Sequence, residues 1–378
     1  MNRKAFLTLL AALLVLGGAG LALFWQDLSS WRSPDAKIGA KLFDKLQVND
    51  VAQIHLKDGK GEATLAIKGQ RWVVKERSDY NANVQDIGDL LVKLPDLKVV
   101  QTENVGASLF PRLDLVDPGK AGKDGDKAGT MLELSDKNGK LLGSLLLGKK
   151  VIKTEDSPLP IKPQTPVGRY VLVPGSQNVL VVSDALTSAE ARPERWLAKD
   201  FFKVERIKAL TASGGAQWKI ARREEYGQWK FAGGGGELDP SAAVAAVNAL
   251  AALAFTDIAP EVKADSFNDP RTYTVETFDD LTYTIKLAKK PGGDDYYLTV
   301  AISGEPPRQR RPEKGEKPED KARLDKQFAE DLKKLDERVK GEKSLAPWTY
   351  VVAGKTLEPL LEDRAQLVAA TKPPASKR

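Results

Sequence analysis

A long apolar run near the N-terminus is followed by shorter patterns in which apolar and polar residues alternate. Ala5 to Trp25 are 21 consecutive residues without a charge. As a helix at about 1.5 Å per residue the run is about 31 Å long, close to the hydrocarbon core of a bilayer. Arg3 and Lys4 precede it, which predicts a cytoplasmic N-terminus and an extracytoplasmic remainder. Residues 1–25 are therefore predicted to be an uncleaved single-pass anchor, with a signal peptide cleaved near Gly20-Leu21-Ala22 as the alternative.

Beyond a juxtamembrane linker over residues 26–44, one apolar pattern occurs twice. Two triplets with the same spacing open the copies: Val48, Val51 and Ile54, and Val204, Ile207 and Leu210. A predicted hairpin follows each triplet and leads to Trp72 in the first copy and Trp229 in the second. Apolar and polar residues alternate in these hairpins, as expected of strands with one buried face.

A helix is predicted after the hairpin in each copy. Asn81 or Asn83 is the expected N-cap of the first helix, and Asp239 followed by Pro240 is expected to start the second. The apolar faces expected to lie on a sheet are Val84, Ile87, Leu90, Leu91 and Leu94 in the first helix, and Val244, Val247, Leu250 and Leu253 in the second.

The second half of each copy begins at an Asp-Pro pair and predicts two strands joined by a tight turn. A strand with Tyr170 closes the first copy and a strand with Tyr350 closes the second. The predicted units span 45–195 and 200–368, with a short Pro- and Arg-containing joint between them and a basic tail over 369–378. The predicted fold class is α+β, as two tandem repeats of an antiparallel sheet with one main helix.

A charged insertion over residues 305–343 interrupts the second copy. It has 24 charged residues in 39 positions, and from Pro318 to Lys340 its helix propensity is high. Five apolar residues form a narrow seam on that helix: Leu324, Phe328, Leu332, Leu335 and Val339. Three interpretations remain open: a solvated helix folded on its own unit, an arm whose seam binds a partner, or a disordered segment.

Composition excludes several chemistries. The chain has no cysteine, so disulfides, thiolate catalysis and cysteine metal sites are excluded. His55 is the one histidine, which excludes a metal site built from several histidines. The net charge is +6, and without Arg3 and Lys4 it is +4, on residues that mix acids with bases. This charge pattern does not predict nucleic-acid binding.

Candidate catalytic and binding motifs are sparse. The glycine run Gly233 to Gly236 is followed by acids that would repel a phosphate, so it predicts a flexible connector. His55 is expected to be structural. Asp279-Asp280 and Asp294-Asp295 are conceivable carboxylate pairs, but both have the context of a turn. Asp124 and Asp126 lack the other ligands of a calcium loop. We therefore expect no cofactor, no metal and no catalytic residue.

The chain resembles the bacterial proteins grouped as domain of unknown function 4340. The resemblance depends on the N-terminal anchor, the opening VNDVAQIHL, the strand RWVV, the first helix, the element LDLVDP and the tyrosine strand. It implies an exported protein anchored in the bacterial inner membrane, and for some members an association with ABC-type transport components. The charged insertion and the proline-rich stretch Ser157 to Pro166 depart from the usual pattern of the family.

These observations favour a non-enzymatic interaction protein outside the cytoplasm. It would be an accessory or scaffold component of an envelope or transport assembly, with the seam as its docking element. One alternative is a glycan- or ligand-binding module that uses strand tryptophans as stacking platforms. A less favoured alternative is a hydrolase that uses carboxylates alone, which requires two acids about 5–10 Å apart in a cleft.

Overall fold

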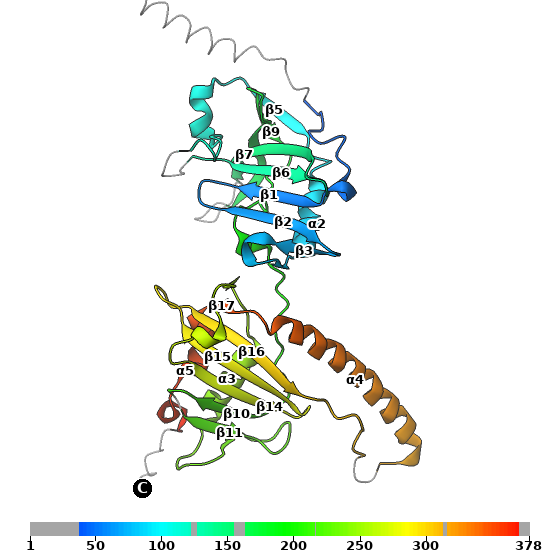
Figure 1. Cartoon of the computed structure of the whole chain (residues 1–378), viewed down its shortest axis with the longest axis vertical. Helices are drawn as coiled ribbons and strands as arrows, with labels where there is room; N and C mark the ends of the chain where they lie inside the picture. The colour runs from blue at the N-terminus through cyan, green and yellow to red at the C-terminus, as the bar shows by residue number, and fades with distance from the viewer. Residues whose placement is uncertain (1–37, 122–126, 155–162, 216, 313–315, 370–378) are drawn as a thin grey trace, which may run out of the picture. The chain divides into compact units, whose positions relative to one another are not determined.

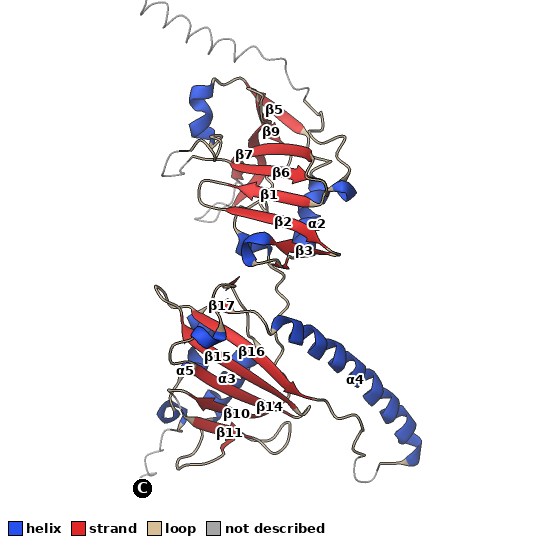
Figure 2. Ribbon diagram, viewed as in Figure 1, coloured by secondary structure: helices blue, strands red, loops and turns tan. Residues whose placement is uncertain are grey.

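A computed structural model describes residues 38–121, 127–154, 163–215, 217–312 and 316–369. The chain divides into two compact units, and the boundary falls between Ala198 and Lys199. An antiparallel sheet forms the main layer of each unit (Figures 1 and 2). The predicted anchor, residues 1–25, lies outside the described residues. Among the helices of the described ranges, none has the length and apolarity needed to cross a bilayer.

The sheet of the first unit has nine strands, in the order β4-β3-β2-β1-β6-β7-β8-β9-β5. Its strands are β1 (Gln53–Lys57), β2 (Glu62–Lys68), β3 (Arg71–Val74), β4 (Tyr80–Asn81), β5 (Val99–Glu103), β6 (Thr130–Ser135), β7 (Leu141–Thr154), β8 (Gln164–Leu172) and β9 (Val179–Val182). The predicted hairpin to Trp72 is β2 and β3, with a turn at Gly69 and Gln70. Strand β1 lies between β2 and β6, so the first apolar triplet leads into the middle of the sheet.

Helix α2 (Val84–Lys93) packs its apolar face into the core of the first unit. Asn83 is its N-cap and accepts hydrogen bonds from the backbone of Gln85 and Asp86, as the sequence predicts. Ile87, Leu90, Leu91 and Leu94 are buried. Val84, in contrast, is 61% exposed, so the prediction that it belongs to the buried face is wrong. As the first helical residue it lies at the end of the helix, where a side chain can remain in solvent.

The segment expected to join the units packs on the first of them. Trp196, at the end of η4 (Pro193–Trp196), is fully buried, and its indole Nε1 donates a hydrogen bond to the carbonyl of Glu190 at 2.9 Å. Its backbone carbonyl accepts from the amide of Asn83 at 2.7 Å. The tryptophan therefore fixes this segment beside the start of α2. Further 3-10 helices of the unit are η1 (Val48–Asp50), η2 (Lys75–Arg77) and η3 (Ala107–Leu113).

The sheet of the second unit has eight strands, in the order β12-β11-β10-β14-β15-β16-β17-β13. Its strands are β10 (Ile207–Ser213), β11 (Trp218–Ala221), β12 (Lys230–Phe231), β13 (Asp257–Ile258), β14 (Arg271–Thr277), β15 (Leu281–Lys289), β16 (Tyr296–Gly304) and β17 (Tyr350–Val352). Buried residues alternate along β14 and β15, which confirms strands with one buried face.

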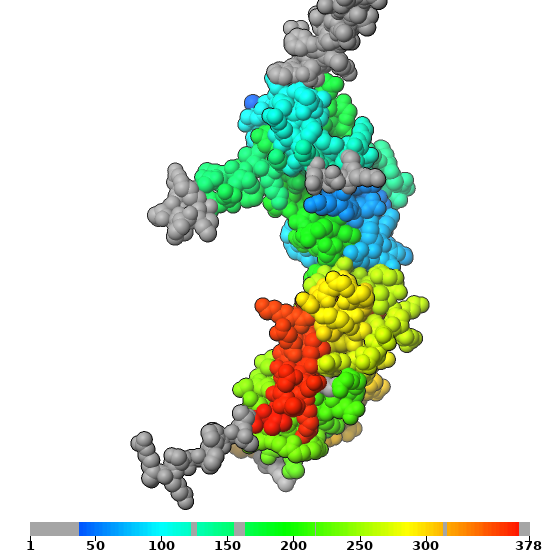
Figure 3. Space-filling view, turned by 90° about the vertical axis from the view of Figure 1, so that its left-hand side faces the viewer, coloured from blue at the N-terminus to red at the C-terminus, as the bar shows by residue number. Residues whose placement is uncertain are grey.

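Three helical segments of this unit, one from its N-terminal half and two from its C-terminal end, pack together. Helix α3 (Pro240–Ala251) starts at the predicted cap Asp239, and α5 (Gly354–Leu361) and η6 (Arg364–Leu367) lie against it. Figure 3 shows the C-terminal segment, in red, at the surface of the unit. Helix α3 buries Ala243, Ala246, Ala249 and Leu250, whereas Val244 is 48% exposed. The prediction for Val244 is wrong because the helix packs through its alanines.

Helix α4 (Pro318–Leu345) is inserted between the neighbouring strands β16 and β17. This helix confirms the prediction of a helical segment from Pro318 to Lys340. Figure 1 shows that its C-terminal end lies near the sheet and that its N-terminal end projects away from it. We call residues 305–312, which lead from β16 toward this projecting end, the strap. The insertion leaves the pairing of β16 with β17 intact.

Gly354 marks a close backbone approach that permits a first test of the fold. A Cβ at this position would lie 2.0 Å from the carbonyl oxygen of Asp294. Gly354→Ala is expected to lower the free energy of unfolding by about 2 kcal/mol, because the clash must be relieved by moving backbone. Gly341, within α4, has open space around its Cα. Gly341→Ala is expected to raise stability by about 0.5–1 kcal/mol. Urea unfolding of both variants checks the opposite signs.

Candidate functional site

The five seam residues predicted from the sequence all lie on α4, but they differ in burial. Leu324, Phe328, Leu332 and Leu335 are half-buried, and Val339 is 5% exposed. Val339 thus belongs to the end of the helix that packs on its own unit. The four half-buried residues form a continuous apolar stripe along the projecting part, which we call the seam from here on.

A buried carboxyl group attaches the C-terminal end of α4 to the second unit. Glu342 is 4% exposed. Its Oε1 accepts a hydrogen bond from the backbone N–H of Lys203 at 3.0 Å, and its Oε2 accepts from the hydroxyl of Tyr283 at 2.8 Å. Tyr283 is itself fully buried on β15. Burial raises the pKa of Tyr283 far above its usual range, and the neighbouring carboxyl group of Glu342 raises it further. The tyrosine therefore stays a donor at all physiological pH values.

Arg338 forms the next contact along the helix. Its Nη1 lies 2.6 Å from Oε2 of Glu205, and its Nε lies 3.8 Å from Oε1 of Glu342. The Nε is buried and has no hydrogen-bond partner in the described part of the chain. Because Glu205 and Lys203 lie just before β10, these contacts attach α4 to the start of that strand.

Two arginines of the strap pair with α4 ahead of its buried C-terminal end, one in the projecting half and one nearer that end. Nε of Arg310 is 2.8 Å from Oδ1 of Asp325, and Arg310 also pairs with Glu316 ahead of the helix. Nη1 of Arg308 is 2.7 Å from Oδ2 of Asp336. Apart from Glu316 these partners are partly exposed, so each such pair contributes about 0–1 kcal/mol. The projecting half is therefore held more weakly than the C-terminal end.

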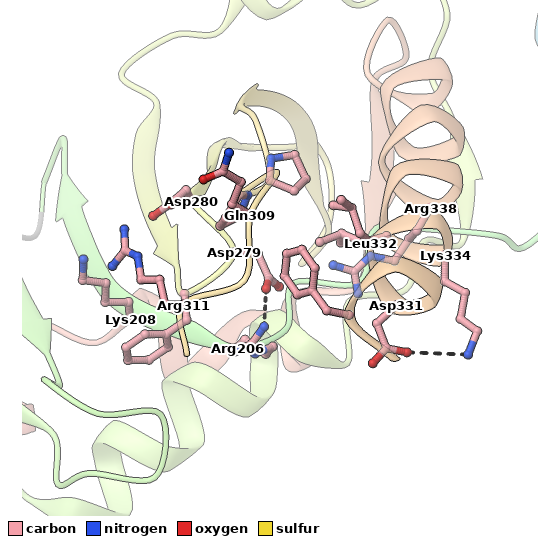
Figure 4. Close-up of a pocket in the computed structure, with 15 residues that line it drawn as sticks. Arg206, Lys208, Asp279, Asp280, Gln309, Arg311, Asp331, Leu332, Lys334 and Arg338 are labelled. Atoms are coloured by element: carbon pink, nitrogen blue, oxygen red, sulfur yellow. Dashed lines mark hydrogen bonds and ion pairs between the residues drawn. The ribbon is translucent and has the colours of Figure 1, made fainter. Parts of the chain in front are cut away.

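A groove of about 670 Å³ lies between α4, the strap and the sheet. Figure 4 shows residues from the three segments around it. The seam contributes Phe328, Leu332 and Leu335 to one wall. The remaining lining residues are Arg206, Lys208, Phe278, Asp279, Asp280, Pro306, Pro307, Gln309, Arg311, Asp331, Lys334 and Arg338. The groove thus combines an apolar wall with many charges.

An ion-pair cluster centres on Arg206, whose backbone has a positive φ of 49°. Its guanidinium makes two parallel contacts of 2.9 Å with the carboxylate of Glu225 and a further ion pair with Asp279. Asp279 is 7% exposed. Burial raises the pKa of Asp279, while the positive charges of Arg206 and Arg338 act in the opposite direction. Burial has the larger effect, so the pKa of Asp279 is raised even though the residue lies in an ion-pair cluster.

The groove carries more positive than negative charge. Five lining residues are basic and three are acidic, namely Arg206, Lys208, Arg311, Lys334 and Arg338 against Asp279, Asp280 and Asp331. Most of the basic groups are neutralised locally, as Lys334 is by Asp331 at 3.7 Å. Lys208 and Arg311 make no ion pair within the described ranges. They lie across the groove from Leu332 and Arg338 (Figure 4).

The other candidates from the sequence do not converge on a site. His55 is half-buried on β1, with Nδ1 3.3 Å from Oε2 of Glu133 and Nε2 3.6 Å from Oε2 of Glu62. Asp294 is fully exposed and pairs with Lys289. Asp124 and Asp126 lie outside the described residues. In the parts of the chain that the structure describes, no three His, Asp or Glu side chains are grouped as metal ligands.

The burial of the described tryptophans is typical of core residues and not of a platform on which a glycan stacks. Trp196 is fully buried, and Trp218 is 4% exposed and donates from Nε1 to the carbonyl of Glu362. Trp72, Trp229 and Trp348 are half-buried. Trp229 has the guanidinium of Arg222 over its ring at 4.8 Å, so one of its faces is occupied. The described tryptophans thus form no exposed row.

The fold and the groove define a protein of mixed α and β structure, with two antiparallel sheets and a helix inserted in the second. The chain also matches a family model, described as domain of unknown function (DUF4340), over residues 72–277. The match covers more than half of the chain and extends from β3 in the first unit to β14 in the second. The chain belongs to this family. No curated protein and no solved structure matches it.

The attachment of α4 can be tested at Glu342. Glu342→Ala is expected to lower the free energy of unfolding by about 3 kcal/mol, because it leaves the Tyr283 hydroxyl and the Lys203 amide without their acceptor. Amides of residues 318–345 should also exchange faster with deuterium. Glu337→Ala on the exposed face of the same helix is the control and should change stability by less than about 0.5 kcal/mol. Equal effects of the two variants would show that the contact does not hold α4.

The raised pKa of Asp279 gives a pH-dependent prediction. Between the ordinary pKa and the raised pKa the folded state binds more protons than the unfolded state, so the contribution of Asp279 to stability falls as pH rises through that window. Asp279→Asn removes this titration. The stability of the parent chain relative to the variant should therefore be greater near pH 3 than at pH 7. Urea unfolding across this range checks the sign, and a difference independent of pH would contradict it.

Proposed function

We propose that this protein is a membrane-anchored extracytoplasmic interaction protein, an accessory or scaffold component of an envelope or ABC-type transport assembly. A partner protein would bind along the seam of α4. One observation carries the proposal: Leu324, Phe328, Leu332 and Leu335 remain half-exposed on a helix that is fixed at its other end. A helix that served its own core alone would bury such a stripe against its sheet.

The energetics of the arm favour docking of a partner protein on the seam. Fully burying a Leu or Phe side chain stabilises a structure by about 1.5–3 kcal/mol, and part of this gain is unused along the seam. The helix and the strap already hold the residues in place, which reduces the ordering cost that a partner must meet. The ion pairs of Arg308 and Arg310 fix the position of the arm and leave the seam open.

The scaffold role is supported by the proposed duplication. With β4 set aside, the two sheets have corresponding strand orders: β3-β2-β1-β6-β7-β8-β9-β5 and β12-β11-β10-β14-β15-β16-β17-β13. A helix precedes the edge strand in both, α2 before β5 and α3 before β13. One detail differs from the sequence comparison. Tyr170 lies in β8, whose counterpart is β16, whereas Tyr350 lies in β17, whose counterpart is β9.

The membrane anchor and the association with transport components are proposed on other grounds than the seam. The uncharged run from Ala5 to Trp25, preceded by Arg3 and Lys4, supports a single span with the two units outside the cytoplasm. The association with transport components is an implication of the resemblance described above.

Substitution within the seam tests the docking function. Phe328→Arg and Leu332→Arg in the full chain are expected to reduce recovery of a specific partner at least tenfold, because a charge replaces an apolar contact. The measurement is crosslinking in intact bacterial cells, purification in mild detergent and mass spectrometry.

Ala329→Arg supplies a control matched in charge. Ala329 is exposed and lies about 100° around the helix from Phe328. It should leave recovery unchanged if the seam is the docking surface. The docking function is wrong if the seam variants and the control recover the same proteins in the same amounts.

A further inference from the structure

The groove beside α4 has walls of different chemistry, and this difference specifies its occupant. From it we propose that the groove binds a segment of the partner protein that carries apolar side chains on one side and carboxylates on the other. This inference rests on the proposed docking function and names the chemistry of the partner.

The apolar requirement comes from the α4 wall and the strap. Phe328, Leu332 and Leu335 line the groove from the helix, and Pro306 and Pro307 line it from the strap. These side chains offer no hydrogen bond, so a polar segment would lose its hydration here without compensation. The part of the occupant that faces α4 must therefore be apolar.

The acidic requirement comes from Lys208 on β10 and Arg311 of the strap, which lie across the groove from Leu332 and Arg338 of α4 (Figure 4). Lys208 and Arg311 are exposed, and in the described part of the chain neither forms an ion pair. The other three basic groups of the lining already have carboxylate partners: Arg206 has Asp279 and Glu225, Arg338 has Glu205, and Lys334 has Asp331. Two positive charges therefore remain for a ligand, and carboxylates complement them.

Asp280 restricts where along the groove the bound segment can carry acidic residues. Asp280 also lines the groove, and its carboxylate would repel an acid placed beside it. Carboxylates of the occupant are therefore expected near Lys208 and Arg311, and a neutral or basic side chain is expected next to Asp280. This arrangement would give the groove a preferred direction for the bound segment.

The length of the seam favours a polypeptide over a small molecule. The groove volume of about 670 Å³ by itself would accommodate a small molecule or a few side chains. The seam, however, continues beyond the groove to Leu324, one helical turn from Phe328. An occupant that covers the whole seam must therefore be longer than the groove, as a helical or extended protein segment would be.

A second copy of α4 is a poorer match for Lys208 and Arg311, which have no ion-pair partner among the described residues. Residues 318–345 contain eight basic and eight acidic residues, so a second α4 brings no net negative charge. The same balance argues against a nucleic acid, which requires a basic surface. An acidic and apolar segment of another protein satisfies both walls.

A photoreactive residue in the groove tests this inference in the full chain. Gln309 is exposed, lines the groove and belongs neither to the seam nor to the pair Lys208 and Arg311. With a benzoyl-phenylalanine at position 309, illumination of intact cells should give an adduct with another protein. Mass spectrometry of the adduct should identify a crosslinked segment that contains apolar residues and at least two more acids than bases.

Charge reversal distinguishes the acidic requirement from docking on the seam. Lys208→Glu combined with Arg311→Glu should lower the adduct yield about tenfold or more, since like charges would then face the occupant. Lys263→Glu combined with Lys355→Glu changes the same charge at exposed positions outside the groove and should leave the yield unchanged.

The possible outcomes separate the two proposals. An adduct that survives the Lys208 and Arg311 reversals but is lost in Phe328→Arg overturns the acidic occupant and leaves docking on the seam intact. A crosslinked segment without an excess of acids, or an adduct with a second copy of this chain, also overturns it. If position 309 gives no protein adduct and the seam variants change no interaction, both proposals fail.

Discussion

The docking of α4 on the second unit depends on one buried carboxyl group. Glu342 joins three parts of the unit, because it accepts from the hydroxyl of Tyr283 on β15 and from the amide of Lys203 before β10, while lying on the helix itself. Burying a carboxyl group without such partners would be strongly unfavourable. These contacts fix the position and direction of the helix, and the seam, the strap and the groove take their positions from it.

The attachment of the helix is uneven along its length, and this unevenness creates the candidate site. Val339, Glu342 and Leu345 are buried at the C-terminal end, whereas the ion pairs that hold the rest of the helix are mostly partly exposed. The apolar side chains of the seam are consequently held in place without being covered. The groove lies within the second unit and draws on its sheet, its strap and its helix, and the first unit is a separate sheet with its own core.

Features that depend on local sequence could be predicted, and features that depend on packing could not. Asn83 and Asp239 were identifiable as helix caps because a cap needs only its own short side chain and the next few amides. Val84 was misassigned because it is the first residue of α2 and its side chain remains in solvent at the helix end. Val244 was misassigned because alanine is compatible with either face of a helix, and in α3 the alanines form the buried face. The seam was visible as a periodicity. Lys208 and Arg311 were missed because they are about 100 residues apart in the chain, and nothing local marks Glu342 as the buried acid of α4.

The insertion of α4 between β16 and β17 also bears on how the second unit folds. These strands are neighbours in the sheet, yet β16 ends at Gly304 and β17 begins at Tyr350, so their pairing must close a long loop. Loop closure costs entropy that grows with the length of flexible chain. A helix with many local contacts forms quickly and removes most of this flexible length before the strands meet. The helix would then act as a rigid spacer during folding, and the rate at which the last strands join the sheet would depend on its helix propensity.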